Sequence, residues 1–287
     1  MLRVPFRLVD VFAERPLEGN QLCVVPDPVA LDEAAMMALT REIAFSETTF
    51  VSSASADRYR MRIFTPAGEL PFAGHPTLGT AFVMVSEGRV TSPATQETAA
   101  GHVRVEVDLA GHMARMRPLP PTWGAEPRDL GAVAAAVGLK TEDLRADWRP
   151  QVAATGVRHL LVAAASGAAV TRAAPDVARL APLLADVNAD AVYLFALTAA
   201  GAKARRFDRW PQMAEDPATG SAAGPVGVYL AMRGVAGMPG RITIRQGAEV
   251  GRPSVLHVEV QRDGDGWQAI VGGGVYVVGE GAFSIEV

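Results

Sequence analysis

The sequence predicts an α+β fold, and two observations support this prediction. Apolar and polar residues alternate in several stretches, as they do in half-buried strands whose successive side chains point to opposite faces. Helix signals lie between only some of these stretches, so the pattern differs from a regular βαβ alternation. With 287 residues and 49% hydrophobic content, the chain can bury one large core or two smaller ones.

The expected elements follow from these patterns. A helix is predicted over Asp32–Ile43, because Asp32 is suited to cap its first turn, and another over Ala178–Val187. Half-buried strands are predicted over Phe6–Phe12, Tyr59–Phe64, Val103–Leu109, His159–Ala165, Ala191–Leu197, Leu256–Val260 and Trp267–Val271.

A proline-rich stretch divides the chain into two halves of domain size. The segment PLPPTWGAEP, residues 118–127, lacks hydrophobic periodicity and is predicted to be a linker. The halves are then residues 1–118 and 128–287.

Each half contains a loop that becomes a helix rich in small residues. GHPTLGTAFVMVSEGRV begins about ten residues after Phe64, and PATGSAAGPVGVYLAMRGV begins about ten residues after Phe207. Small side chains let a helix approach surrounding strands closely, so a central helix is predicted near residues 75–87 and another near 217–233. Two unrelated buried helices would also explain the pattern.

Composition and charge exclude several classes of protein. A formal net charge of −4 and a pI near 5.8 argue against nucleic-acid binding, which needs a basic face. Charges at Arg3, Arg7 and Asp10 interrupt the N-terminal residues, so we expect neither a signal peptide nor a membrane helix. We therefore expect the protein to be cytoplasmic.

The residues that commonly bind metals are scarce. Cys23 is the single cysteine, which excludes an internal disulfide and a Cys-rich metal site. No two histidines have the spacing of a HExxH zinc site; they are His75, His102, His112, His159 and His257. With no G-x-G-x-x-G turn between a strand and a helix either, we expect no metal and no cofactor, although Mg²⁺ binding by carboxylates alone stays open.

Three residues are candidates for acid–base chemistry. Glu47, in AFSETTFV, interrupts residues expected to be buried, and a carboxyl group partly removed from water can act as general acid and base near neutrality. His75 and Asp216 each precede a proline near a predicted helix start, where backbone N–H groups attract anions. A water-facing strand edge for Glu47, a structural histidine and a simple N-cap for Asp216 are the competing interpretations.

Other polar residues flank apolar strands. Asn20 in LEGNQLCVV and Gln246–Gly247 in RQGAEVGRPS occupy positions expected at the edge of a cleft, and turn formation explains them equally well. Cys23 lies in an apolar run and is predicted to be a buried small hydrophobe rather than a nucleophile.

Taken together, these segments resemble the PhzF family of phenazine-biosynthesis isomerases, whose members share the diaminopimelate-epimerase-like fold. The segments that carry the resemblance, in the family's order and approximate spacing, are DVFAERPLEGNQLCVV, FSETTFV, RIFTPAGELPFAGHPTLGTA, EDPATGSAAGP and QGAEVGRPS. The resemblance implies two pseudo-symmetric halves, each a curled mixed sheet or barrel around a central helix. It also implies a homodimer and an active site in the cleft where the two helix starts converge.

The resemblance also implies roles for particular residues. Glu47 matches the family's proton-transfer glutamate, and His75 and Asp216 match its polar helpers. Ser221, with the backbone of Thr219 and Gly220, matches the substrate-binding loop; Asn20 at the expected cleft edge and Gly74 at the helix start are further predicted substrate-binding residues. Related epimerases place a cysteine at the start of each central helix, whereas this chain has Ala73–Gly74 and Pro217–Ala218 there. Inversion by two thiols is therefore not available to it.

The sequence thus predicts a cofactor-independent isomerase that moves a proton within a small cyclic or amino-acid-like carboxylate, with Glu47 as the base. In the phenazine enzyme the substrate is trans-2,3-dihydro-3-hydroxyanthranilate. The alternatives are an epimerase or lyase that uses the same base, and a ligand-binding member of the fold without catalysis.

Overall fold

The structure is a computed structural model that describes residues 1–287 except 28–30, 210–214, 236 and 287. Its internal contacts divide the chain into two compact units, each described here by itself. Unit 1 comprises Met1–Pro118 and Ile270–Val287, and unit 2 comprises Leu119–Ala269. The division predicted from sequence assigned residues 270–287 to the second half, whereas their contacts are made in unit 1. The segment predicted as a linker, beyond Pro118, belongs to unit 2.

Unit 1 is a barrel of mixed parallel and antiparallel strands. The order is β1-β2-β3-β4-β6-β7-β8-β16, and the antiparallel pairing of β1 with β16 closes it. Strands β2 and β3 are parallel, as are β4 and β6. The strand bounds are Leu2–Val11 (β1), Asn20–Val25 (β2), Glu47–Ser55 (β3), Arg58–Thr65 (β4), Gly68–Leu70 (β5, which pairs with β4), Ala94–Thr98 (β6), Gly101–Asp108 (β7), Met113–Arg117 (β8) and Gly266–Ile285 (β16).

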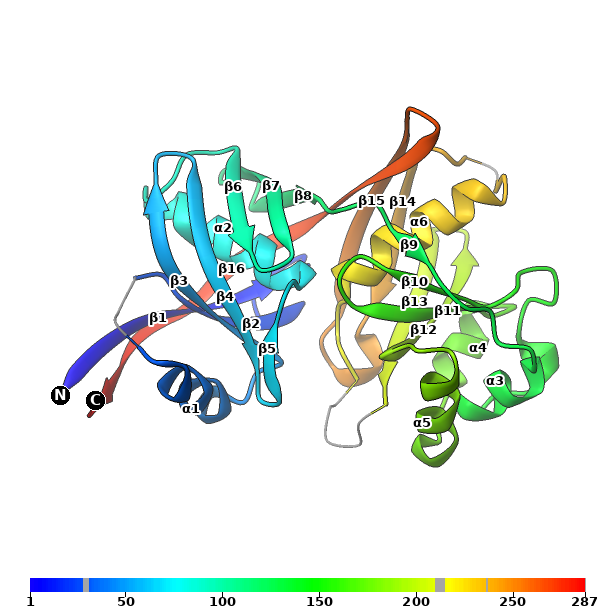
Figure 1. The fold of residues 1–287 in the computed structure, drawn as a ribbon. Helices are drawn as coiled ribbons and strands as arrows, with labels where there is room; N and C mark the ends of the chain where they lie inside the picture. The colour runs from blue at the N-terminus through cyan, green and yellow to red at the C-terminus, as the bar shows by residue number, and fades with distance from the viewer. Residues whose placement is uncertain (28–30, 210–214, 236, 287) are drawn as a thin grey trace. The chain divides into compact units, whose positions relative to one another are not determined.

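Helix α2, Gly74–Ser86, lies inside this barrel (Figure 1). It contacts β1, β2, β3, β6, β7 and β8, and every residue from Gly74 to Met84 is buried. Gly79 permits the close approach: a Cβ built there would lie 2.6 Å from Cδ2 of Leu22 and 2.8 Å from Cγ2 of Val11. A helix that is apolar and small on all sides suits a position surrounded by strands.

Helix α1, Glu33–Ile43, covers the outside of the barrel. Asp32 is its N-cap and accepts a hydrogen bond from the backbone N–H of Ala35, which confirms the predicted start. Met36 and Leu39 pack into an apolar cluster with Phe50 and other buried side chains of the barrel wall. The parts of β3 and β4 beneath α1, Thr48–Val51 and Ile63–Thr65, are therefore buried.

Unit 2 is built on a sheet of order β9-β10-β11-β12-β13-β14-β15, followed by the start of β16. Its parallel pairs are β11 with β12 and β13 with β14. The strand bounds are Thr122–Trp123 (β9), Gln151–Ala154 (β10), Arg158–Ala163 (β11), Ala191–Thr198 (β12), Gly201–Asp208 (β13), Arg241–Gln246 (β14) and Ser254–Asp263 (β15).

The central helix of unit 2 is α6, Gly220–Met232, which contacts β10, β11 and β15. All its residues from Gly220 to Ala231 are buried. Gly227 again marks a close approach, because a Cβ there would lie 2.7 Å from Cγ2 of Val260 and 2.8 Å from Cγ1 of Val258. The sequence predicted that this helix starts near residue 217. In the structure α6 begins three residues beyond Pro217, so the proline precedes the helix and is not in its first turn.

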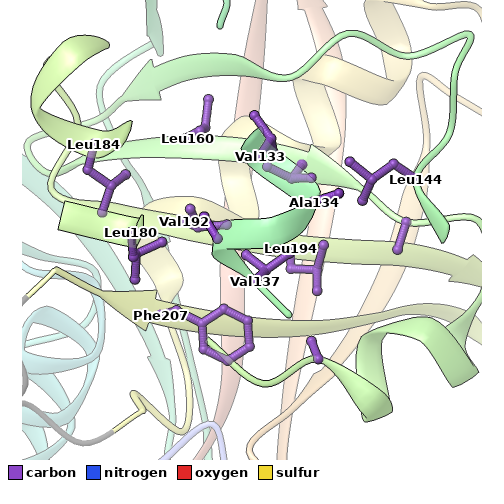
Figure 2. Close-up of a cluster of buried hydrophobic side chains, with 14 of the residues drawn as sticks. Val133, Ala134, Val137, Leu144, Leu160, Leu180, Leu184, Val192, Leu194 and Phe207 are labelled. Carbon is purple, nitrogen blue, oxygen red and sulfur yellow. The ribbon is translucent and has the colours of Figure 1, made fainter. Parts of the chain in front are cut away.

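Short helices cover the other face of the unit 2 sheet: α3 (Leu130–Ala136), α4 (Gly167–Arg172) and α5 (Val177–Asp186). Figure 2 shows the apolar cluster beneath them, where side chains of α3 and α5 meet those of the strands. Along β12 the side chains alternate: Val192 and Leu194 enter this cluster, whereas the ring of Phe195 packs edge-on against Tyr229 of α6. Coverage on both faces explains why β12 is buried from Ala191 to Ala196.

Two 3-10 turns, Thr141–Asp143 and Ala248–Val250, complete the described elements. The predicted strands and helices all occur, with ends that differ by a few residues, except that β16 extends to Ile285 instead of ending near Val271. Among the described residues, no helix is long and apolar enough to cross a membrane.

Candidate functional site

In unit 1 the start of α2 lies beside a partly buried carboxylate. Glu47 is the first residue of β3, and His75 is the second residue of α2. Nε2 of His75 lies 3.4 Å from Oε2 of Glu47, and their side chains are 5% and 15% exposed. Both atoms are buried without a hydrogen-bond partner among the described residues. A carboxylate and an imidazole thus face one another with hydrogen-bonding capacity left for a further group.

Asn20, the first residue of β2, orients His75. Its Nδ2 lies 3.1 Å from Nδ1 of His75, and its Oδ1 accepts a hydrogen bond from Oγ of Ser46. This network assigns the amide so that Asn20 donates to Nδ1. In the neutral ring the proton then lies on Nε2, on the side of Glu47. The sequence assigned Asn20 to substrate binding; in the structure its side chain contacts the histidine.

The two central helices lack side-chain caps, unlike the outer ones. Helices α1, α3, α4 and α5 each begin after an aspartate or serine whose side chain accepts a backbone N–H. Ala73 precedes α2 and has no side chain able to cap it, while Thr219 precedes α6 and its side chain caps no backbone N–H. Buried first-turn N–H groups of this kind are donors available to a ligand.

The loop before α6 is held by one glutamine. Oε1 of Gln246 accepts from the hydroxyl of Tyr193 at 2.9 Å and from the backbone N–H of Thr219 at 3.2 Å. Its Nε2 donates to the backbone carbonyl of Asp216 and to Oγ1 of Thr219. The Thr219 hydroxyl in turn donates to Oδ2 of Asp216. Asp216 therefore is not the N-cap of α6; its carboxylate takes up the hydroxyl that would otherwise cap the helix.

Ser221, the second residue of α6, is fixed through both its backbone and its side chain. Pro225 lacks an N–H, so the carbonyl of Ser221 has no partner four residues along the helix; the hydroxyl of Thr155 donates to it instead, at 2.9 Å. Oγ of Ser221 lies 3.1 Å from Nε2 of His159, on β11. Gly220 precedes it as the first residue of the helix.

Sequence reasoning missed several of these residues. His159 entered it only as a histidine without metal-site spacing and as the start of a predicted strand, and no role was given to Gln96, Thr155 or Tyr193. The available signal was polarity at buried positions: His159 stands near the start of β11, whose following residues are all apolar. Gln96 has an equivalent role in unit 1, because it accepts from the Tyr59 hydroxyl and donates to Oγ1 of Thr77 in α2.

The remaining candidates are placed as follows. Cys23 is buried in β2, where loss of hydration raises the pKa of its thiol to about 12. A thiol held in its neutral form is a poor nucleophile. Gly74 is the first residue of α2. Within the described residues no three His, Cys, Asp or Glu side chains gather as a metal site requires, and independence from metals and cofactors stays a prediction.

Solved structures define the class of fold. The chain aligns over 98% of its length, and 99% of the other chain, with a predicted epimerase from Pseudomonas aeruginosa at 36% identity and a TM-score of 0.86. A probable proline racemase from Agrobacterium radiobacter shares the fold at 13% identity, with a TM-score of 0.64 and 98% and 93% of the two chains covered. The fold is thus the α+β fold of the diaminopimelate-epimerase-like proteins.

The family follows from the sequence comparisons. The model of the phenazine biosynthesis-like (PhzC-PhzF) family matches residues 9–283. The trans-2,3-dihydro-3-hydroxyanthranilate isomerase of Pseudomonas chlororaphis is 34% identical over 262 residues, which cover 90% of this chain and 91% of that protein. The chain belongs to the PhzC-PhzF family, as the motifs predicted, and it is an isomerase.

Proposed function

We propose that this isomerase moves a proton between two carbons of a small cyclic carboxylate, with Glu47 as both general acid and general base. One observation carries the proposal: Oε2 of Glu47 and Nε2 of His75 face one another at 3.4 Å, both buried and without a hydrogen-bond partner among the described residues. A carboxylate in such surroundings can take a proton from one carbon and return it to another.

The proposed substrate class is a ring carboxylate like that of the named relatives. Three Pseudomonas relatives, 33–34% identical, are trans-2,3-dihydro-3-hydroxyanthranilate isomerases. In that reaction the base removes a proton from a ring carbon, the electron pair shifts through the adjacent double bond, and the proton returns at another ring carbon. The resulting enol becomes a ketone, so that no redox partner is consumed.

His75 is proposed to assist Glu47 rather than to act as the base. Asn20 donates to Nδ1 and leaves the ring proton on Nε2, beside the carboxylate. From there the imidazole can donate to a carboxylate that has just lost its proton, and so stabilise the charged form. Asp216 is proposed to act as a second polar helper through the loop that precedes α6.

The start of α6 is proposed to bind the carboxylate of the substrate. Its first-turn N–H groups have no side-chain cap, and the helix dipole places about half a positive charge there. Gly220 and Ser221 would contribute backbone N–H groups, and Ser221 its hydroxyl as well; Thr219, whose own N–H is donated to Gln246, is proposed to line the site. Gly74, at the uncapped start of α2, is proposed as a further backbone donor.

The proposal is tested by incubating the enzyme with trans-2,3-dihydro-3-hydroxyanthranilate in D₂O and following the product by NMR. We expect isomerisation with deuterium at the ring carbon that receives the shuttled proton and at the carbon beside the ketone, which takes up a solvent deuteron when the enol becomes a ketone; for Glu47→Gln the rate should be about 10²- to 10⁴-fold lower. Glu42→Gln, an exposed carboxylate on α1, is the matched control and should react normally. Exchange at the wild-type rate in Glu47→Gln would refute the role of Glu47.

The same experiment separates the alternatives. Return of deuterium to the carbon that lost the proton, with inverted configuration, would indicate an epimerase that uses a single base. Loss of a substituent would indicate a lyase. Binding of the substrate without any exchange would indicate a member of the family that retains the ligand site alone.

Two further parts of the proposal rest on the family resemblance and the sequence. Turnover should survive dialysis and chelation by EDTA, because the sequence lacks a cysteine or histidine ligand cluster and a nucleotide-binding turn. We also propose a cytoplasmic homodimer. Light scattering after size-exclusion chromatography should then give twice the chain mass of 30.2 kDa.

A further inference from the structure

His159, the second residue of β11, is a fully buried histidine that the proposed proton transfer does not use. Its Nε2 lies 3.1 Å from Oγ of Ser221, and its ring packs edge-on against Tyr193. Its Nδ1 is buried and has no hydrogen-bond partner among the described residues. The ring thus makes one polar contact, and that contact is with a proposed ligand-binding side chain.

The surroundings of His159 keep the ring neutral. Burial lowers the pKa of His159 to about 3; the positive charge of Arg206 acts in the same direction, and Asp190 opposes it. A neutral imidazole carries one N–H, on either Nδ1 or Nε2. On Nδ1 it would be a buried donor without a partner, which costs more than an unfilled acceptor. The proton therefore lies on Nε2 and is donated to Ser221.

This tautomer decides what Ser221 can offer a ligand. Oγ of Ser221 accepts from His159, so its own O–H is not used in that bond and is left to donate. The opposite tautomer would accept the serine proton and leave only oxygen lone pairs, which repel a carboxylate. We propose that His159 is a positioning residue that fixes Ser221 as a hydrogen-bond donor to an anionic oxygen of the ligand.

The backbone of Ser221 is fixed from the same part of unit 2. Thr155, in the turn between β10 and β11, binds the carbonyl that Pro225 leaves without a helical partner. The turn and the strand that follows it thus hold Ser221 at two points, one on the backbone and one on the hydroxyl. A hydroxyl with fixed position and fixed polarity favours a carboxylate over a neutral amide.

The inference rests on the proposed binding of a carboxylate at α6, and binding of 2-aminobenzoate tests it independently of turnover. We expect Ser221→Ala and His159→Phe each to weaken binding by about tenfold to a hundredfold. The double variant should lose no more than Ser221→Ala alone, because His159 acts through the serine. His159→Gln, whose amide N–H can replace Nε2–H, should retain most of the affinity. Binding of 2-aminobenzamide should be similar in all variants.

Additive losses in the double variant, or normal affinity in His159→Phe, would overturn the inference. So would a wild-type enzyme that does not prefer 2-aminobenzoate to 2-aminobenzamide, whatever the deuterium exchange shows. Failure of exchange with intact non-additive binding would instead refute the proposed proton transfer alone. As a direct readout, ¹⁵N NMR of labelled histidine should show a neutral ring protonated on Nε2 from pH 5 to 8, and a ring protonated on Nδ1 would contradict the assignment.

Discussion

The two central helices begin in the same way and present different chemistry. Helices α2 and α6 each span 13 residues, are buried along almost their whole length and lack a side-chain cap. At the second position, however, α2 carries His75 and α6 carries Ser221. The histidine faces a carboxylate from the first residue of β3, whereas the serine faces a histidine from the second residue of β11. The same backbone arrangement thus presents two different pairs of side chains.

The supports of the two helices are also alike. In unit 1 the Tyr59 hydroxyl donates to Gln96, which donates to Thr77 in the first turn of α2. In unit 2 the Tyr193 hydroxyl donates to Gln246, which donates to Thr219 just before α6. A buried amide that accepts from a tyrosine thus holds the start of each helix, and buried hydrogen-bond networks of this kind restrict movement.

The difference lies in which groups can change protonation. The pair in unit 1 joins a carboxylate and an imidazole, each able to gain or lose a proton. In unit 2 the serine hydroxyl does not ionise at any relevant pH, and burial keeps His159 neutral. We therefore infer that unit 1 carries the proton transfer and unit 2 the binding, and the following changes test this division.

The largest expected effect is on turnover. His75→Asn keeps a polar group near Asn20 and removes the N–H beside Glu47, so kcat should fall about a hundredfold with little change in KM. His75→Gln, whose amide can occupy the place of Nε2, should recover part of the rate. Steady-state kinetics measures both. Equal changes in KM for His75→Asn and Ser221→Ala would remove the distinction between the units.

The second effect is on stability at acid pH. The pKa of His159 is about 3 in the folded chain and about 6.5 when unfolded, so between these values the unfolded chain binds more protons. The free energy of unfolding is therefore unaffected by this group above about pH 6.5. It falls by up to about 1.4 kcal/mol per pH unit as the pH drops from there towards 3, because the unfolded chain takes up a proton that the folded chain does not.

Tryptophan fluorescence can follow this loss in unit 2 specifically, because Trp123, Trp148, Trp210 and Trp267 all fall within residues 119–269. Urea unfolding between pH 7.5 and 4.5 should give a steeper decline for the wild type than for His159→Phe. Parallel curves for the two proteins would show that His159 is accessible to protons in the folded state.

How far the sequence predicts the fold depends on how local the pattern is. The cap of α1 at Asp32 and the strands β4 and β12 are readable within a few residues, and they were predicted correctly, although β12 is buried on both faces instead of half-buried. The strand that closes the barrel of unit 1, β16, was predicted only as far as Val271. Its end pairs with β1, with Leu2 opposite Ile285, and no local pattern indicates a partner at the other end of the chain. The glycines at 272–274 further interrupt the alternation that would have marked it.

The site shows the same limit. Glu47, His75 and Asp216 were identified from their positions before prolines or within apolar runs, and the structure brings Glu47 and His75 together. The contact of His159 with Ser221 joins residues 62 positions apart on a strand and a helix. Which buried histidine meets which hydroxyl depends on the register of β11 beside α6, and this register is not encoded in either segment alone.

The third effect tests the packing of the central helices. Gly→Ala gains about 1 kcal/mol of helix propensity but costs about 1–3 kcal/mol where the added methyl group overlaps its neighbours. At Gly227 the overlap is with Val258 and Val260, whose branched side chains move little, whereas at Gly79 one neighbour is the flexible end of Leu22. We expect Gly227→Ala to destabilise the protein by about 1–2 kcal/mol and Gly79→Ala by less.

Urea unfolding followed by circular dichroism measures both variants, and tryptophan fluorescence adds a readout for unit 2. Gly234→Ala is unsuitable as a control because its φ of 64° disfavours alanine. Ala38→Gly, at an exposed position in the middle of α1, tests the propensity term alone. Stabilisation of the protein by Gly227→Ala would show that α6 can move away from β15.

The smallest expected effect distinguishes the two tyrosines. Tyr59→Phe and Tyr193→Phe each remove one hydroxyl and keep the ring, so each loses a hydrogen bond worth about 1 kcal/mol. In unit 2, Oε1 of Gln246 still accepts the backbone N–H of Thr219, whereas Tyr59 is the one donor that the described structure gives Oε1 of Gln96. A buried acceptor left without any donor adds to the cost.

Urea unfolding should therefore show Tyr59→Phe as the more destabilised variant, by about 1–2 kcal/mol against about 0.5–1 kcal/mol for Tyr193→Phe. Because Gln246 also positions Thr219, Tyr193→Phe alone should raise the KM, and the reverse order in both measurements would contradict the assignment of binding to unit 2.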